Sequence, residues 1–165
     1  MRCIVLLVLT SLSLQAQPTS PKEYEAAYEQ RIRKSRIGDV YIPRDYQDAF
    51  IELERLSTKA DLEKFRNAPE KEVAKKLHFG LGKWIMTNWS FYEGSRFSHF
   101  LKEKGLTFPD DMAQVTIRLF HRHLNRLPLE DEVLIKEYVD DRTKAFQNEL
   151  NQREVIDSFR RKKEE

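Results

Sequence analysis

The fold of this chain is decided by residues 78–112, whose sequence is HFGLGKWIMTNWSFYEGSRFSHFLKEKGLTFPDDM. This segment contains both tryptophans, four of the five glycines and two of the four histidines. Leu81, Trp84, Ile85 and Asn88 have the i, i+3, i+4, i+7 spacing of one helical face, which predicts a helix over residues 81–89. Such crowding of aromatic, ionisable and helix-breaking residues makes the segment the first place to look for a site.

Helix boundaries can be read on both sides of this segment. Gly94 and Ser95 end one helix and cap the next, Gly105 is a C′ residue, and Pro109 starts another helix. Upstream and downstream, apolar spacing and capping residues predict helices at residues 22–36, 44–56, 58–67, 70–77, 109–125 and 130–160.

Apolar and polar residues do not alternate over any window long enough to predict a sheet, and residues 38–43 are expected to be extended. The sequence therefore predicts an all-α fold, with one compact multi-helix domain and a long C-terminal helix. The predicted divisions are a signal peptide at 1–16, a linker and charged helix at 17–39, the helical domain at 40–127, and the long helix with a charged tail at 128–165.

The first sixteen residues have the pattern of a cleaved export signal. Arg2 precedes an apolar run, and Ala16 offers a small residue for cleavage before Gln17. The run is too short to span a bilayer, which takes roughly 20 residues, so no stable membrane anchor is expected after cleavage. We expect the protein to be exported, to the periplasm or the medium.

Export would remove Cys3, the only cysteine, and so exclude disulfides, a cysteine nucleophile and a zinc–thiolate site. Without Arg2 the chain has 28 Lys and Arg residues against 27 Asp and Glu residues. These charges alternate in sign along the predicted helices and form no basic stripe, so a nucleic-acid partner is not expected.

Two pairs near the segment invite a chemical interpretation. Gly80 and Gly82 suggest a phosphate loop, but Leu77 and Trp84 occupy positions where that motif needs a glycine and a serine or threonine. The two glycines are therefore expected to be structural, allowing close approach of the backbone or of the tryptophans.

Asp110 and Asp111 form a pair of carboxylates directly after Phe108 and Pro109. We expect them in a first helical turn, where acidic side chains face unpaired N–H groups. The alternative is a role in acid–base catalysis or metal binding.

His121 and His123 point about 200° apart on a helix, so one metal ion cannot easily take both, and no metal site is predicted. His123 falls inside the apolar arc and is expected to be a hydrogen-bonded, buried or half-buried structural residue. His121 lies at the edge of that arc and is the better candidate for function.

The remaining polar residues leave two hypotheses open. One is a buried structural network of Asn88, Arg96 and Asp111. The other is a ligand pocket, whose lining residues would be His78, Trp84, Asn88, Trp89 and Arg96.

Several blocks together resemble a bacterial helical domain of unknown function. They are HFGLGKWIMTNW, SRFSHFLKEKG, FPDDM and FHRHLN, with YIPRDYQDAFIELERL and LEKFRNAPEKE upstream. The resemblance covers roughly residues 40–127. It implies a short helical module and carries no reaction, cofactor or catalytic residue.

The leading hypothesis is a non-enzymatic protein- or peptide-binding module of the cell envelope, with no cofactor and with its oligomeric state open. Its anchors would be Trp84, Trp89, Phe91, Tyr92 and Arg96, the types of residue enriched at binding hot spots. One alternative is a hydrolase that uses His78 or His121 with Asp110 or Asp111. The other is small-ligand binding between helices, in an apolar pocket beside Trp84.

Overall fold

The computed structural model describes residues 20–164, and side chains up to residue 153. The described chain is predominantly helical and ends in a long helix, which confirms that part of the prediction. The predicted signal peptide lies outside the described residues. The helices are α1 (Pro21–Arg31), α2 (Tyr46–Leu56), α3 (Lys59–Asn67), α4 (Glu70–Leu77), α5 (Lys83–Asn88), α6 (Arg96–Glu103), α7 (Pro109–Leu124) and α8 (Asp131–Glu164).

The prediction of an all-α fold missed a small antiparallel hairpin. Strand β1 (Arg36–Ile37) pairs with β2 (Val40–Tyr41), with Arg36 opposite Tyr41. A two-residue turn, Gly38-Asp39, joins them, which is a recognised hairpin signal. Two residues in each strand are too few to give the alternation on which strand prediction depends.

Side-chain capping sets several of the helix starts. Asp45, Thr58 and Ser95 each accept a backbone N–H from the residue three positions further on. Ser95 and Ser98 form a reciprocal capping box, which holds the start of α6 in the buried interior. These bonds satisfy N–H groups that a helix start leaves without intrahelical partners.

Helices α4 and α5 are joined without a break by a π-helical segment, η1 (His78–Gly82). The helix expected to begin near residue 81 is therefore the continuation of α4. A π-helical turn inserts an extra residue into the helical ladder and changes the direction of the following side chains.

Helix α7 forms the centre of the domain. It packs against α2, α3, α4, η1, α5, α6 and α8. Ten of its sixteen residues are buried, so it is covered on nearly all sides. The largest fully buried side chains are Trp89, Phe50 and Phe97, together with Phe120 of α7 itself.

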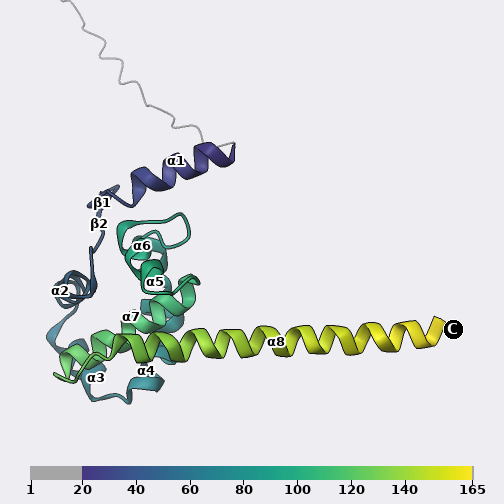
Figure 1. Cartoon of the computed structure of the whole chain (residues 1–165). Coiled ribbons are helices and arrows are strands. Elements are labelled where there is room, and N and C mark those ends of the chain that lie inside the picture. The colour runs from purple at the N-terminus through teal and green to yellow at the C-terminus, as the bar shows by residue number, and fades with distance from the viewer. Residues whose placement is uncertain (1–19, 165) are drawn as a thin grey trace, which may run out of the picture.

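Helix α1 lies against the opposite side of the domain from α8, and no residue of α1 is buried (Figure 1). The ring of Tyr28 packs on Gly94, whose φ is +90° and where an added Cβ would overlap that ring. The Tyr28 hydroxyl lies 3.0 Å from His99 Nδ1, and Arg31 Nε donates to the Gly94 carbonyl at 3.0 Å. Gly94 therefore forms a turn and provides the surface on which Tyr28 of α1 packs.

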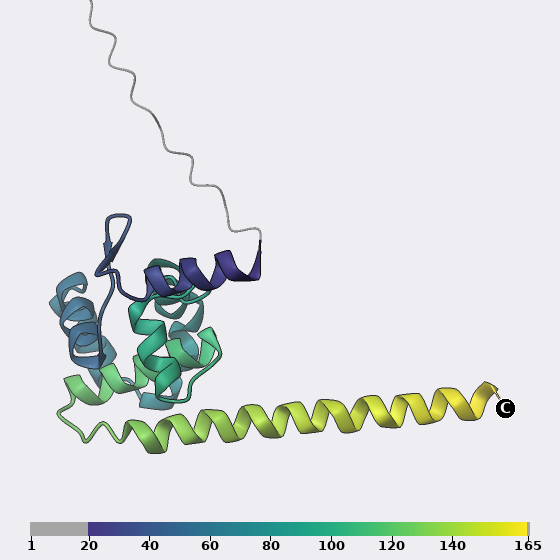
Figure 2. The same cartoon turned by 45° about the horizontal axis from the view of Figure 1, so that its top comes forward.

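Helix α8 begins on the domain and then runs well beyond it (Figures 1 and 2). Leu134 and Ile135 are buried, whereas every residue from 141 to 153 is exposed. Among the described helices, none combines the length and the apolar character needed to cross a membrane.

Candidate functional site

The π-helical segment exposes its phenylalanine and holds its histidine partly inside. Phe79 is 84 % exposed, and the rings of His78 and Phe79 meet edge to face. A Cβ added at Gly80 would meet nothing within 4 Å, and one at Gly82 would make only ordinary contacts. The close approach expected at these two glycines is therefore not found.

His78 and Asp110 come together, as the hydrolase hypothesis required of one histidine and one carboxylate. His78 Nε2 lies 3.3 Å from Asp110 Oδ1. His78 Nδ1 is buried without a hydrogen-bond partner. A general base needs one ring nitrogen facing the nucleophile, and neither nitrogen of His78 is placed to do so.

The aromatic anchors of the expected binding surface divide between core and surface. Trp89 is fully buried and Phe91 is 2 % exposed, with both rings packed against Phe97. Trp84 is half-buried and meets Trp89 edge to face. Tyr92 alone of the aromatic anchors is strongly exposed, at 64 %. A partner that docks here would find one aromatic side chain and no cluster.

Asn88, Arg96 and Asp111 do not form the network considered from the sequence. Asn88 Nδ2 donates to the Trp84 carbonyl, one turn back on its own helix. Arg96 Nε donates to the Ile42 carbonyl at 2.7 Å, and the Arg96 guanidinium lies over the Tyr41 ring. These partners could not be predicted, because Ile42 is 54 positions away from Arg96 along the chain.

Asp110 and Asp111 occupy the first turn of α7, and neither caps its helix through a side-chain hydrogen bond. Asp111 is 7 % exposed and binds Arg142 of α8 through two contacts, at 3.0 and 2.5 Å. Asp111 therefore fastens α8 to the domain.

The histidines of α7 have different partners. His121 is buried, contrary to the expectation that it lies at the surface edge, and its Nε2 lies 2.8 Å from the Ala68 carbonyl. His123 is half-buried, stacks on Phe50, and places Nε2 3.0 Å from Glu54 Oε1. His121 thus connects α7 to the turn before α4.

A charged network that the sequence did not reveal joins α4, α7 and α8. The Arg118 side chain is 5 % exposed and contacts Glu70 at 2.8 Å and Glu137 at 3.1 Å. Arg122 Nε donates to the second oxygen of Glu70 at 3.0 Å. Burial acts to raise the pKa of Glu70, but the hydrogen bonds from Arg122 and Arg118 outweigh it and lower that pKa below its ordinary value.

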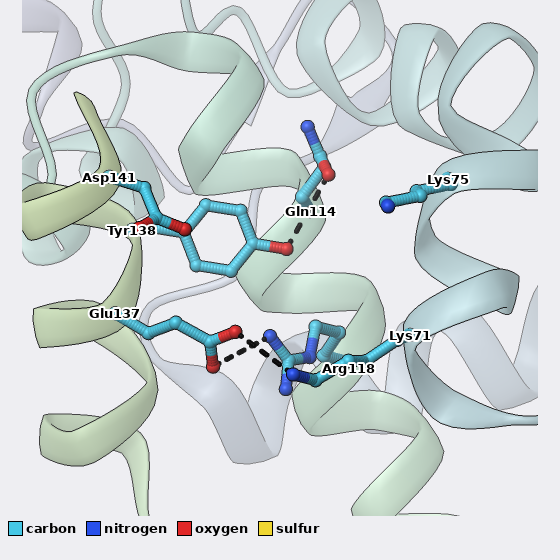
Figure 3. Close-up of a pocket in the computed structure, with 7 residues that line it drawn as sticks. All are labelled: Lys71, Lys75, Gln114, Arg118, Glu137, Tyr138 and Asp141. Atoms are coloured by element: carbon cyan, nitrogen blue, oxygen red, sulfur yellow. Dashed lines mark hydrogen bonds and ion pairs between the residues drawn. The ribbon is translucent and has the colours of Figure 1, made fainter. Parts of the chain in front are cut away.

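A polar hollow of about 310 Å³ opens beside this network (Figure 3). Arg118 is held by Glu137 on one side of it, and Tyr138 reaches Gln114 at 3.4 Å across it. Lys71 pairs with Glu137 at 3.4 Å, while Lys75 extends into the hollow from α4. Arg118 and Lys71 both pair with Glu137 here. We therefore interpret the hollow as the junction between α4, α7 and α8.

The other described hollow is an apolar groove along α3, α4 and η1, with a volume of about 430 Å³. Its floor includes buried Val73 and Phe120. The full lining is Ser57, Asp61, Leu62, Lys64, Phe65, Ala68, Pro69, Glu72, Val73, Lys76, Leu77, Leu81 and Phe120. Trp84, beside which a hydrophobic pocket was expected, lines neither of these two hollows, and the groove reaches only Leu81. Neither hollow is lined by His78 or Asp110.

Comparison with protein families gives one match, which covers residues 42–124. The family is described as a domain of unknown function, DUF6794. The chain belongs to this family. Comparisons with curated proteins and with solved structures gave no significant match.

The DUF6794 match contains every residue that lines the apolar groove, and also Glu70, Arg118 and Arg122 of the charged network. The α8 residues Glu137 and Arg142 lie outside the match. In the described residues, no group of three or more His, Cys, Asp or Glu side chains is arranged to hold a metal ion. The groove therefore lies wholly within the DUF6794 match, whereas the charged network extends beyond it to α8.

Proposed function

We propose that this protein is an exported, non-enzymatic module of the cell envelope, and that it binds a peptide segment of a partner protein in the groove along α3 and α4. The observation that carries the proposal is an apolar groove without a covering element in the described part of the chain. The surface expected from the sequence, around Trp89 and Phe91, is core.

The side walls of the groove keep apolar groups partly in water. Leu62, Phe65, Leu77 and Leu81 are half-buried, although each has a fully apolar side chain. Covering apolar surface stabilises a complex by roughly 25 cal/mol per Å² before the costs of association. Contiguous apolar surface of this kind is typical of interaction sites.

The rim favours a peptide over a small apolar molecule. Asp61, Lys64, Glu72 and Lys76 are all exposed and carry charges of both signs. An amphipathic peptide helix can place apolar side chains in the groove and its own charged side chains against this rim.

Catalysis has weaker support. One ring nitrogen of His78 lies 3.3 Å from Asp110 Oδ1, and the other is buried. General acid–base catalysis needs a histidine that faces a bound substrate, and His78 lines neither hollow found in the described residues.

A matched pair of substitutions tests the groove. Peptides of about 15 residues are first selected from a random library on the wild-type protein, which gives a helix of about 22 Å. Leu62→Glu puts a charge into the groove wall, and Ile51→Glu makes the same change on α2, where the side chain is 66 % exposed. We expect Leu62→Glu to weaken peptide affinity at least about tenfold, which is about 1.4 kcal/mol, and Ile51→Glu to leave it unchanged.

Fluorescence anisotropy with labelled peptides provides the dissociation constants. Peptides that bind both variants equally would contradict the groove proposal, as would a library that yields no binder. Displacement of a bound apolar dye without any peptide binding would instead favour the small-ligand alternative.

Export has a separate test. Cells that express the full chain are fractionated, and the recovered protein is analysed by mass spectrometry. The proposal predicts an N-terminus at Gln17 in the envelope or medium fraction. Recovery of the uncleaved chain in the cytoplasm alone would contradict it.

A further inference from the structure

The polar hollow between α4, α7 and α8 contains a lysine without an acidic partner (Figure 3). Lys71 and Arg118 contact separate carboxylate oxygens of Glu137, at 3.4 and 3.1 Å, so both oxygens of that residue are engaged. Lys75 also extends into the hollow, and among the described side chains no carboxylate lies within ion-pair distance of its ammonium group. The ion pairs inside the hollow therefore leave one cation unmatched.

The charges that line the hollow show the same excess. Three cationic and two acidic side chains line it, a net charge of +1. The second acidic residue, Asp141, lies 3.7 Å from Lys144 on its own helix, and both of these side chains are exposed. Asp141 is therefore already close to a different cation and does not neutralise Lys75.

Acidic residues around the hollow are engaged elsewhere as well. Glu70 contacts two arginines of α7 through its separate oxygens, at 2.8 and 3.0 Å. Asp110 does not line the hollow, and its Oδ1 lies 3.3 Å from His78 Nε2. An anion that enters the hollow therefore meets, at Lys75, an ammonium group that no described carboxylate contacts.

The groups beside Lys75 suit a carboxylate with a short carbon chain. Gln114 Oε1 accepts a hydrogen bond from the Tyr138 hydroxyl at 3.4 Å, whereas the Gln114 amide nitrogen has no hydrogen-bond partner in the described part of the chain. That N–H group and the Lys75 ammonium can donate to the two oxygens of one carboxylate. The Tyr138 ring offers an apolar surface to the carbon chain.

Charge and size narrow the class of ligand further. A carboxylate carries one negative charge, which matches the net charge of the lining, whereas a phosphate monoester carries about 1.5 to 2. The volume of about 310 Å³ lies at the lower end of the range for ligand pockets, roughly 300–1,000 Å³. The Arg118 side chain, which is 5 % exposed, gives the hollow one buried and fixed wall. A small organic acid meets these conditions.

We propose that the hollow between α4, α7 and α8 binds a small organic carboxylate, and that Lys75 and Gln114 hold its two oxygens. Tyr138 belongs to α8 and Lys75 to the DUF6794 domain, so the bound acid links this helix to the domain. No residue of the hollow lines the α3–α4 groove, so the proposal stands or falls independently of peptide binding.

An NMR titration of the protein with butyrate at constant ionic strength tests the site. Butyramide is the matched control ligand, because it has nearly the same shape and no charge. We expect butyrate to shift the backbone amide signals of residues 71–75 and 114–118 saturably, and butyramide to leave them in place. Equal shifts with the two ligands would overturn the proposal, as would the absence of a saturable shift with butyrate.

A pair of lysine substitutions on α4 tests the role of Lys75. Lys75→Gln should raise the dissociation constant for butyrate at least about tenfold. Lys76→Gln removes the same charge from the next residue, but Lys76 pairs with Glu72 at 2.8 Å and lines the groove, so it should bind butyrate like the wild type. Both lysines are exposed, and circular dichroism should show that both variants are folded. Equal weakening by the two substitutions would indicate only a general attraction of anions and would overturn the site.

Three further ligands identify the source of the carboxylate. A tetraalanine peptide is titrated with a free C-terminus and as its C-terminal amide. Tighter binding of the free peptide than of butyrate would make the ligand a protein C-terminus, and tighter binding of butyrate would make it a free acid. Inorganic phosphate is the third ligand, and binding of phosphate more tightly than either carboxylate would contradict the proposed ligand class.

Discussion

Residues 78–112 and the groove along α3 and α4 differ in a way that bears directly on function. The first region holds both tryptophans and most of the glycines, yet Trp89 and Phe91 are core and Arg96 is bound to the Ile42 carbonyl. The groove is built mainly from leucine, phenylalanine, valine and lysine, and it remains open. Unusual residues gather where packing is demanding, whereas a binding surface can be made of ordinary apolar residues that the fold leaves uncovered.

If this comparison is right, substitution of Trp89 acts on stability. Trp89→Ala removes a fully buried ring that packs on Trp84 and Phe97, and should lower the free energy of unfolding by about 3–5 kcal/mol. Tyr92→Ala, at a residue that is 64 % exposed, should change it by less than about 0.5 kcal/mol. Urea titrations measure both, and a Trp89→Ala protein as stable as the wild type would show that this ring is not a core residue.

The buried charges provide the next largest expected effect. Arg118→Met keeps much of the side-chain volume but leaves Glu70 and Glu137 without this guanidinium, so we expect a loss of about 3 kcal/mol. Arg153→Met is the control, because Arg153 and its partner Glu149 are both exposed, and it should be nearly neutral. Equal effects of the two substitutions in urea titrations would mean that the network contributes no more than a surface ion pair.

Substitution of Gly94 tests whether residues 78–112 hold α1 in place through the contact with Tyr28. Gly94→Ala forces alanine into a positive φ and against the Tyr28 ring, so it should cost about 2 kcal/mol. Gly105→Ala shares the positive φ, but the nearest atom to its Cβ would be 3.9 Å away, and we expect about 1 kcal/mol. Thermal unfolding compares the two. A smaller loss for Gly94→Ala than for Gly105→Ala would contradict the close contact.

Protonation of Glu70 at low pH should lower the free energy of unfolding by less than the substitutions above. Its pKa is lower in the folded protein than its ordinary value of 4.5, because the hydrogen bonds from Arg122 and Arg118 outweigh the effect of burial. The resulting stabilisation is present above pH 4.5 and is lost as the pH falls below that value toward the folded-state pKa. In urea titrations between pH 6 and pH 3, Glu70→Gln should reduce the fall in stability, and an unchanged fall would exclude this contribution.

The sequence predicted what depends on neighbours along the chain. The starts of α3, α6 and α7 were predicted because Thr58, Ser95 and Pro109 act within one helical turn. The prediction failed for contacts between distant segments. Asp111 was assigned to its own helix start, but its partner Arg142 lies 31 positions away, and nothing near Arg118 in the sequence indicates Glu70.

The site shows the same limit. Aromatic type alone could not separate buried Phe91 from exposed Tyr92, its neighbour in the chain, because a turn directs them to opposite environments. The groove could not be foreseen, since the apolar spacing of α3 and α4 predicts faces turned toward the core. Whether such a face is fully covered depends on how far apart the helices sit.

The most direct test of the functional claim is an NMR titration of the wild-type protein with a selected peptide. The account predicts that backbone amide signals of residues 61–81 shift as peptide is added, while those of residues 89–96 stay in place. Shifts concentrated around Tyr92 and Arg96, with the signals of residues 61–81 unmoved, would contradict it and place the binding surface at residues 89–96.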